Sequence, residues 1–265
     1  MNNATAGSIT DTKVSILIPV RNEGLNLRIM LKILKAVVEV PYEVLVIYDH
    51  PDDDSVPVVN ELKDEQPQLQ AVHNTIGPGV AHAIRAGVDE SRGEYILIFA
   101  ADEVGPVLAI EDMLKLMEDG CEFVSCTRYA HGGRRLGGSF IGGILSRTAN
   151  RLFRIIAGIS FTDCTTGIKM FRRSIFHQLH LEAKPVGWAV AFEMAIKAQH
   201  LRLRLGEVPI ISIDRLYGGE STFKLGSWTV EYSKWFLWGA FHLRRLGRKQ
   251  TKVAVALPSY YVPVR

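Results

Sequence analysis

The strongest constraint on the fold is an alternation of strand-like and helix-like segments in the first part of the chain. Residues 14–20 and 42–48 are apolar, β-branched runs typical of buried strands, and residues 95–100 repeat the pattern. Between them, residues 25–38 and 80–90 carry apolar side chains at helical spacing. This order implies right-handed crossovers and parallel pairing, with ligands at the carboxyl ends of the strands. We therefore predict an α/β fold with a mostly parallel central sheet flanked by helices.

The pattern changes after residue 102. The expected elements there are a helix over 110–119, a strand over 123–126, a glycine-rich loop over 132–143, a helix over 145–157, a strand over 169–171, a helix over 192–200 and a strand over 207–213. No internal repeat or low-complexity linker divides the chain. We expect a polar, disordered tail over residues 1–12, one domain over 13–227 and a C-terminal extension over 228–265.

Polar and acidic residues follow the predicted strands at their carboxyl ends. Pro-Val-Arg-Asn-Glu stands at residues 19–23, Tyr48 is followed by Asp49, and Ala101 is followed by Asp102. Because the carboxyl ends of parallel strands meet at one edge of a sheet, we expect these residues to line a single crevice. Each carboxylate also fits the ordinary role of a turn former or helix cap.

The charges of the chain are divided unevenly, although the formal net charge is only +3. Between Arg128 and Arg173 there are nine Lys or Arg residues and a single acid, Asp163. No nucleic-acid-binding motif accompanies this stretch, so we expect no nucleic acid partner. A small anionic ligand fits better, although single arginines such as Arg134, Arg135, Arg151 and Arg154 also fit a solvated basic face.

Cysteine usage and hydropathy bear on the compartment. Cys121, Cys126 and Cys164 form no Cys-x-x-Cys pair and have no histidine spacing suited to a zinc site. A reducing, cytoplasmic compartment is the simplest inference. The first residues lack the basic start and apolar core of a signal peptide, and no apolar run of about 18 residues predicts a membrane-spanning helix.

The C-terminal extension combines aromatic and basic residues. Residues 228–241 are rich in Trp, Phe and Tyr, and Arg244, Arg245, Arg248 and Lys249 follow. This composition suits an amphipathic helix lying on an anionic membrane surface. The same aromatic residues would equally cover the core of the domain or a partner subunit. The sequence does not predict an oligomeric state.

Three segments, taken in order, resemble a known enzyme family. They are Ile18-Pro19-Val20-Arg21-Asn22-Glu23, the run from Asp163-Cys164-Thr165-Thr166-Gly167 to Arg172, and the run from Glu207-Val208-Pro209-Ile210 through Asp214-Arg215-Leu216-Tyr217-Gly218 to Lys224. Together they resemble family-2 glycosyltransferases of the GT-A fold, and within them the dolichol- or polyprenyl-phosphate mannosyl- and glucosyltransferases. The similarity runs from about residue 14 to residue 226.

The resemblance implies a nucleotide-sugar donor and a divalent metal, Mg²⁺ or Mn²⁺. It places the donor at Pro19, Val20, Asn22, Glu23, Asp49, Gly79, Ala101 and Lys224, and the metal at Asp102. The family's usual Asp-x-Asp-x-Gln motif reads Ala100-Ala101-Asp102-Glu103-Val104 here, and its paired acids read Tyr48-Asp49. One carboxylate remains at each place, which weakens the metal assignment without removing it. Few protein carboxylates suffice where substrate phosphates also bind the metal.

The resemblance also implies an anionic acceptor. It places Arg128 and Arg147 at the acceptor phosphate, where the planar fork of arginine matches phosphate oxygens. Arg215 and Lys224 become the cations that stabilise the leaving diphosphate. A phosphate monoester is already largely ionised near neutral pH and needs no strong general base. Glu193 is the candidate base for a hydroxyl acceptor, with structural pairing to an arginine as its alternative.

The resulting hypothesis is an inverting hexosyltransferase. It would move mannose or glucose from a GDP- or UDP-sugar to a polyprenyl or dolichyl phosphate, on the cytoplasmic face of a membrane. A transferase acting on a saccharide hydroxyl in surface polysaccharide assembly is the first alternative. A non-catalytic nucleotide-sugar-binding protein is the second, suggested by Ala100 and Val104. A dehydrogenase is poorly supported, because no Gly-x-Gly-x-x-Gly follows the first strand.

Overall fold

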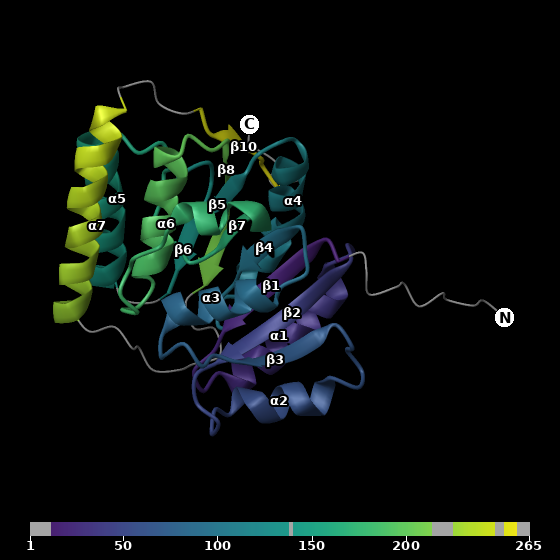
Figure 1. Ribbon diagram of the computed structural model, residues 1–265. Coiled ribbons are helices and arrows are strands. Elements are labelled where there is room, and N and C mark those ends of the chain that lie inside the picture. The colour runs from purple at the N-terminus through teal and green to yellow at the C-terminus, as the bar shows by residue number, and fades with distance from the viewer. Residues whose placement is uncertain (1–11, 138–139, 214–224, 247–251, 259–265) are drawn as a thin grey trace.

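The computed structural model describes residues 12–137, 140–213, 225–246 and 252–258 (Figure 1). Among these residues an eight-stranded sheet has the order β10-β8-β5-β7-β4-β1-β2-β3, and β6 pairs with β9 in a second sheet. The strands are β1 (Val14–Pro19), β2 (Tyr42–Tyr48), β3 (Leu69–His73), β4 (Tyr95–Ile98), β5 (Phe123–Thr127), β6 (Arg134–Leu136), β7 (Lys169–Arg172), β8 (Leu205–Pro209), β9 (Ile211–Ile213) and β10 (Ala254–Val255). The helices are α1 (Gly24–Val37), α2 (Ser55–Leu62), α3 (Val80–Glu90), α4 (Ile110–Glu118), α5 (Phe140–Ala157), α6 (Ala189–His200) and α7 (Leu225–Arg245).

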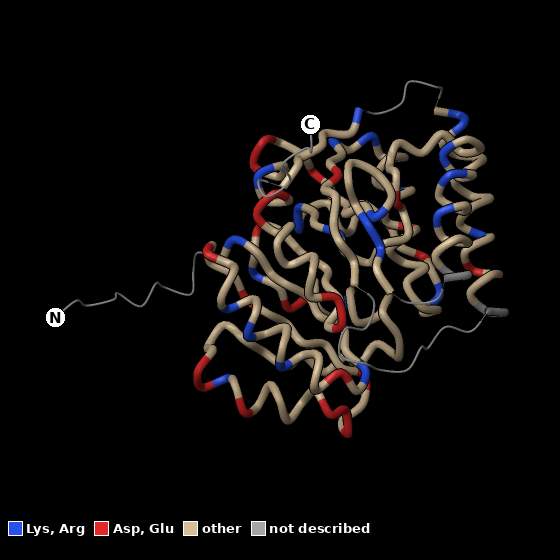
Figure 2. The backbone as a smooth tube through the Cα atoms, turned by 180° about the vertical axis from the view of Figure 1, so that it is seen from behind, with Lys and Arg blue, Asp and Glu red and all other residues tan. Residues whose placement is uncertain are grey.

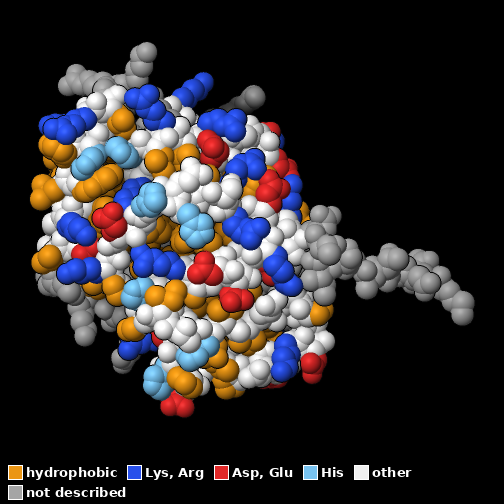
Figure 3. All heavy atoms as spheres, in the orientation of Figure 1, with side chains coloured by type: hydrophobic (Ala, Val, Ile, Leu, Met, Phe, Trp, Pro, Cys, Tyr) orange, Lys and Arg blue, Asp and Glu red, His pale blue; other side chains and the backbone are white. Residues whose placement is uncertain are grey.

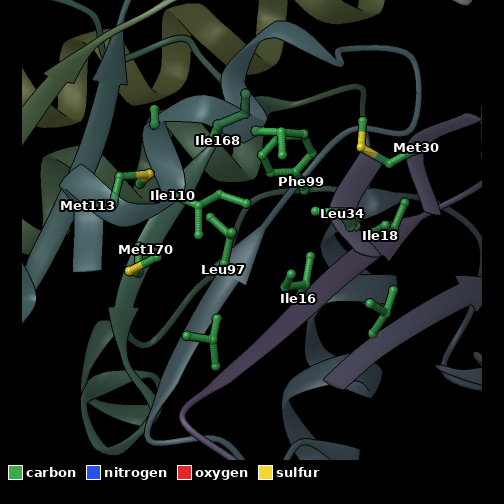
Figure 4. Packing of buried hydrophobic residues seen from close by; sticks show 14 of the residues in the cluster. Ile16, Ile18, Met30, Leu34, Leu97, Phe99, Ile110, Met113, Ile168 and Met170 are labelled. Atoms are coloured by element: carbon green, nitrogen blue, oxygen red, sulfur yellow. The ribbon is translucent and has the colours of Figure 1, made fainter. Parts of the chain in front are cut away.

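Helices cover both faces of the large sheet, which explains why its strands are apolar along their length. Ile16 and Ile18 of β1 share a core with Leu34 of α1 and with residues of α2 and α4 (Figure 4). Leu17, between them, belongs to a second core with residues of α3, α5, α6 and α7. Successive side chains of a strand point to opposite faces, so a sheet covered twice needs apolar residues at every position. Each fully buried side chain of this kind contributes about 1.5–3 kcal/mol.

The predicted mostly parallel sheet is confirmed, with one exception inside it. β7 runs antiparallel to both of its neighbours, β4 and β5. The other neighbouring pairs of the large sheet are parallel. Because β7 begins where its parallel neighbours end, the loop that precedes it lies at their carboxyl edge. Residues 162–168 therefore join the edge where the polar residues were expected.

Several predicted elements differ from the structure in their bounds. The predicted glycine-rich loop over 132–143 contains β6 and the first turn of α5. The predicted strand over 207–213 is two strands, because the chain leaves β5 after Pro209 and β9 then pairs with β6. The prediction also lacks α2 and β3. Only Leu69 of β3 is buried, and the other residues of this edge strand are half-buried or exposed, so β3 lacks the continuous apolar signal of the inner strands.

The C-terminal helix α7 packs against α5 and α6 and contributes to the core of the protein. Trp235 is fully buried, and the ring of Phe236 lies 5.0 Å from that of Phe153. Most of the aromatic residues thus cover the protein's own core, as the alternative prediction stated. Val230, Leu237 and Phe241 remain exposed. None of the described helices is both long and apolar enough to cross a membrane.

The structure describes the cysteines and part of the C-terminal region, but little of the predicted N-terminal tail. The predicted tail over residues 1–12 lies outside the described residues, apart from Thr12. β10 adds to the outer edge of the large sheet beside β8. All three cysteines are buried and unpaired. The domain limits at residues 227 and 228, and the cytoplasmic compartment, stay predictions.

Candidate active site

The loops at the carboxyl edge of the large sheet bring the predicted polar residues together. Those after β1, β2 and β4 carry Glu23, Asp49 and Asp102, and the loop after β5 carries Arg128. Lys and Arg recur on the chain beyond β5, along α5 and α7 in particular (Figure 2). The edge thus has acidic residues on the β1–β2 side and arginines on the β5 side.

The loop after β1 is fixed by the loop after β2. The backbone N–H groups of residues 22–24 donate in turn to Asp53 Oδ2 at 3.0 Å, Ser55 Oγ at 3.1 Å and Asp54 Oδ1 at 2.8 Å. Asn22 has a φ of +56°, a left-handed conformation that asparagine tolerates better than most residues. Asp53 and Asp54, two of the crowded acids after β2, thus shape the loop that presents Asn22 and Glu23. The sequence did not predict this role, although three consecutive acids in one loop were a visible sign that the loop has a special function.

Asp49 and Gly79, predicted as separate donor contacts, are bonded to each other. Asp49 Oδ2 accepts the N–H of Gly79 at 2.8 Å, and its Oδ1 accepts the amide of Asn74 at 2.6 Å. Gly79 has a φ of +100°, and a Cβ there would stand 2.7 Å from Pro185. Only glycine fits this position. Asp49 therefore holds the loop that begins α3, and its contact with a nucleoside stays a prediction.

The residues around Asp102 suit a metal held largely by substrate. Asp102 is half-buried in the loop after β4, beside the buried Ala101. Glu103 accepts a hydrogen bond from Ser212 Oγ at 3.1 Å. Within the described part of the chain, no group of three His, Cys, Asp or Glu side chains is placed to hold a metal ion. One carboxylate oxygen donor fits Mg²⁺ or Mn²⁺ only where phosphate oxygens supply further ligands.

Arg128 is bound by the protein rather than open to solvent. Its Nε lies 2.7 Å from Asp163 Oδ2, and its Nη2 donates to Asp163 Oδ1 at 3.1 Å and to Thr165 Oγ1 at 2.9 Å. Burial alone would lower the pKa of Arg128, but the charge of Asp163 outweighs it and raises that pKa. Burial would likewise raise the pKa of Asp163, but Arg128 lowers it. Both groups stay charged at neutral pH.

Tyr129 brings the two predicted phosphate-binding arginines together. The Arg128 guanidinium lies 5.2 Å from the centre of the Tyr129 ring, and that of Arg147 lies 5.9 Å from it. The Tyr129 hydroxyl donates to Ser146 Oγ at 2.9 Å, which ties the loop after β5 to α5. Arg147 is exposed. Sequence reasoning missed Tyr129 as the link, because nothing in a single sequence shows which helix faces it.

Glu193 has its carboxylate occupied by structural contacts. It is fully buried in α6 and accepts the N–H of Glu182 at 2.6 Å and that of Ala183 at 2.8 Å. Its Oε1 also lies 2.8 Å from Lys197 Nζ. Burial raises the pKa of Glu193, against these hydrogen bonds. The contacts favour the predicted structural role, although the partner is a lysine instead of an arginine.

For the remaining predicted site residues that the structure describes, it gives a position in the chain but no contact that bears on their predicted roles. Val20 is buried and donates its N–H to Ile47 O at 2.9 Å, while Pro19 ends β1 and is half-buried. Arg215 and Lys224 lie outside the described residues. Their roles as cations for the leaving group stay predictions.

Comparisons with known proteins agree with the fold. The sequence model of Glycosyl transferase family 2 matches residues 15–179, more than half of the 265 residues. The chain is 26% identical to a dolichol-phosphate mannosyltransferase of Pyrococcus furiosus over 83% of its length, and it spans only 61% of that protein. It is also 26% identical to a polyprenol monophosphomannose synthase of Mycolicibacterium smegmatis, covering 81% of this chain and 86% of the relative.

A solved structure supports the same fold. Glucosyl-3-phosphoglycerate synthase of Mycobacterium tuberculosis, in complex with Mn²⁺, UDP and glucosyl-3-phosphoglycerate, has a TM-score of 0.64 and 15% sequence identity. The match covers 87% of this chain and 80% of that one. At this identity the likeness concerns the fold alone. With the matched family sequence and the mostly parallel sheet that carries Asp49, Asp102 and Arg128 at one edge, this chain belongs to glycosyl transferase family 2 and has the GT-A fold.

Proposed function

We propose that this protein transfers a hexose, mannose or glucose, from a GDP- or UDP-sugar to a polyprenyl phosphate, with inversion at the sugar. One observation carries the proposal: the Arg128–Tyr129–Arg147 cluster lies at the same sheet edge as the half-buried Asp102. The proposed phosphate-binding arginines and the candidate metal ligand thus lie at one edge of the sheet, after β5 and β4, which are separated by β7. The relatives named for dolichol-phosphate and polyprenol-phosphate mannose synthesis support the same acceptor class.

The chemistry asks little of the protein beyond binding and charge. The acceptor phosphate oxygen attacks the anomeric carbon as the bond from that carbon to the donor diphosphate breaks, and the nucleoside diphosphate leaves with the electron pair. No proton must be removed from an ionised phosphate monoester. This fits Glu193, whose carboxylate is taken up by Lys197 and two backbone N–H groups. A divalent metal, with Asp102 as its protein ligand, would stabilise the charge on the leaving diphosphate.

Arg147 and Arg128 have different parts in this proposal. Arg147 is exposed on α5 with its guanidinium 5.9 Å from the centre of the Tyr129 ring, and it binds the phosphate directly. Arg128 has Nε and Nη2 bonded to Asp163, and its guanidinium carbon lies 5.2 Å from the centre of the Tyr129 ring. Arginine suits both tasks because its planar fork bonds oxygens on more than one side.

A membrane surface is the proposed location of the acceptor, on the cytoplasmic face. Apolar side chains are exposed on α7 at Leu237 and Phe241, and on α5 at Leu152 and Ile155. Arg151, Arg154, Arg244 and Arg245 are exposed on the same two helices. Hydrophobic and basic side chains alternate along the flank of α7 (Figure 3). Interleaved apolar and cationic groups suit a surface that lies on anionic headgroups.

The test compares variants with a soluble acceptor and with a membrane-bound one. Arg147→Ala should lower transfer to water-soluble geranyl phosphate about tenfold or more, since a charge-assisted contact is worth about 1.5–3 kcal/mol. Arg151→Ala, also an exposed change on α5, is the control and should have little effect with this soluble acceptor. Neutralising Arg244 and Arg245 should lower transfer only when the acceptor is in anionic vesicles. Equal rates for Arg147→Ala and wild type would reject this acceptor site.

A further inference from the structure

Three polar side chains form a row inside the large sheet, below the loop that holds Asp163. Ser125 of β5 is in register with Lys169 of β7 on one side and with Glu207 of β8 on the other. Lys169 and Ser125 are 0% exposed and Glu207 is 1% exposed. Residues in register on neighbouring strands project from the same face. We call these three residues the buried polar row.

The buried polar row replaces what would otherwise be hydrophobic core. Two residues along the same strands, Phe123 and Phe171 stack with ring centres 6.1 Å apart. Burying a lysine and a glutamate beside such rings is costly unless both are hydrogen-bonded. Lys169 Nζ donates to Ser125 Oγ at 2.7 Å. Burial lowers the pKa of Lys169 and raises that of Glu207 to about 7.

The Glu207 carboxylate binds the backbone of the loop that precedes β7. Its Oε1 accepts the N–H of Thr162 at 2.8 Å and that of Asp163 at 3.3 Å. Thr162 is tied a second time, through a 2.6 Å contact between its Oγ1 and that of Thr127. The groups of neighbouring elements that act electrostatically on Glu207 include the Asp163 carboxylate, the Lys169 amine and the thiol of Cys164. Cys126, next to Ser125 on β5, belongs to the core on the opposite face of the sheet.

From this backbone a short series of contacts reaches the proposed phosphate site. The Asp163 carboxylate, held by its backbone, binds Arg128 Nε at 2.7 Å and Nη2 at 3.1 Å. The Arg128 guanidinium in turn lies against the Tyr129 ring. A shift of the backbone at Asp163 would therefore move the guanidinium.

We propose that Glu207 is a positioning residue for the acceptor phosphate, because it fixes the backbone of Thr162 and Asp163 and thereby the place of Arg128. This inference rests on the proposed function, which assigns Arg128 to the phosphate site. Glu207 itself touches no substrate. Misplacing a substrate-binding group by about 1 Å costs a large factor in rate, so a buried residue of this kind controls activity from a distance.

The chain offers a matched control in Glu43 of β2. Glu43 is also 1% exposed, and it accepts the N–H of Arg92 at 2.7 Å and the hydroxyl of Ser15 at 2.6 Å. It is thus a second buried carboxylate that binds backbone, but four strands away from β5 in the sheet. Removing it tests the cost of losing such a group without touching Arg128.

The experiment uses Glu207→Met, Glu207→Asp and Glu207→Gln with two readouts. The first is the KM for geranyl phosphate beside the affinity for the donor nucleotide. The second is the NMR signal of the Arg128 Nε–H in ¹⁵N-arginine-labelled protein without substrate, assigned with Arg128→Lys. Glu207→Met should raise the acceptor KM about tenfold, leave nucleotide affinity within about twofold, and shift or broaden the Arg128 signal.

The other variants separate positioning from folding. Glu207→Gln should resemble wild type in both readouts, because its amide oxygen accepts the same N–H groups. Glu207→Asp withdraws the carboxylate by one methylene and should resemble Glu207→Met, and it replaces that variant where Met does not fold. Glu43→Met should lower stability yet change neither readout.

Two results would overturn the proposal. One is an unchanged Arg128 signal and acceptor KM in both Glu207→Met and Glu207→Asp. The other is an equal change of both readouts in Glu43→Met. If wild type transfers sugar to no prenyl phosphate, the proposed function fails, while the Arg128 signal still decides whether Glu207 positions that guanidinium.

Discussion

At the scale of single residues, burial decides which arginine reports on function. The Arg128 side chain is 11% exposed and paired with a fully buried Asp163. Removing one partner of a buried ion pair typically costs about 3–5 kcal/mol, because the other charge is left uncompensated. Arg128→Ala should therefore impair folding and activity together. Arg147 is exposed, so its removal reports on binding without that loss.

The metal assignment is tested at Asp102. Asp102→Asn keeps the size of the side chain but removes its charge, so Mn²⁺-dependent binding of a nucleotide-sugar should be lost while the fold is retained. Calorimetry with and without Mn²⁺ measures this binding, and thermal unfolding checks the fold. Glu111→Gln, an exposed change on α4, should leave binding unaltered. Unchanged Mn²⁺-dependent affinity in Asp102→Asn would remove Asp102 from the metal site.

Glu207 should make stability depend on pH near neutrality. Its pKa is raised to about 7 in the folded protein, mainly by burial, whereas an unfolded glutamate titrates at about 4.3. Between these two pKa values the folded state binds more protons than the unfolded state, so the free energy of unfolding falls as pH rises. From about pH 5 to about pH 8, wild type should lose about 2 kcal/mol of unfolding free energy relative to Glu207→Gln.

Urea unfolding of both proteins at several pH values measures that difference. Asp163 acts in another window: Arg128 lowers its pKa against the effect of burial, so its contribution is lost only in acid. A difference between wild type and Glu207→Gln that is constant over this range would show that Glu207 stays ionised.

At the scale of elements, the contact between α5 and α7 depends on a glycine. A Cβ at Gly239 of α7 would stand 2.5 Å from the ring of Phe153 in α5. That ring cannot easily move, because Phe192 and Phe236 lie 4.9 Å and 5.0 Å from it. The closeness of the two helices therefore requires a residue without a side chain at this position.

Gly239→Ala should destabilise the protein despite the better helix propensity of alanine. The propensity gain is about 1 kcal/mol, whereas overpacking a fixed core costs about 1–3 kcal/mol, so we expect a net loss. Ser233→Ala, at an exposed position of the same helix, should be neutral or slightly stabilising. Urea unfolding compares the two, and a more stable Gly239→Ala would show that the helices can separate at no cost.

The elements also show how far the sequence predicts the structure. β2 and α3 agree with their predicted bounds, because continuous apolar runs and helical spacing are local signals. β7 could be predicted as a strand but not as an antiparallel one between β4 and β5, since partner choice depends on the whole chain. Likewise Asp49 and Asp102 could be placed at the sheet edge, whereas the link of Asp49 to Asn74 required the folded loops.

At the scale of the whole molecule, the two sides of one sheet edge carry different sets of residues. The β1–β2 side holds the loops of Glu23 and Asp49, where the donor nucleotide is proposed to bind. The β5–β8 side carries Arg128 and continues into the basic, partly apolar surface of α5 and α7, where the acceptor is proposed to lie. Asp102, after β4, stands between the two sides in the strand order.

The most direct test of this division is sugar transfer itself. The purified protein is incubated with Mn²⁺, a labelled GDP- or UDP-sugar and a polyprenyl phosphate, and the products are extracted into organic solvent. We predict a labelled, acid-labile lipid that forms with the prenyl phosphate, and that forms about tenfold or more slowly in the Arg147→Ala variant. Label transferred only to an oligosaccharide, or no transfer to any acceptor despite tight donor binding, would contradict it.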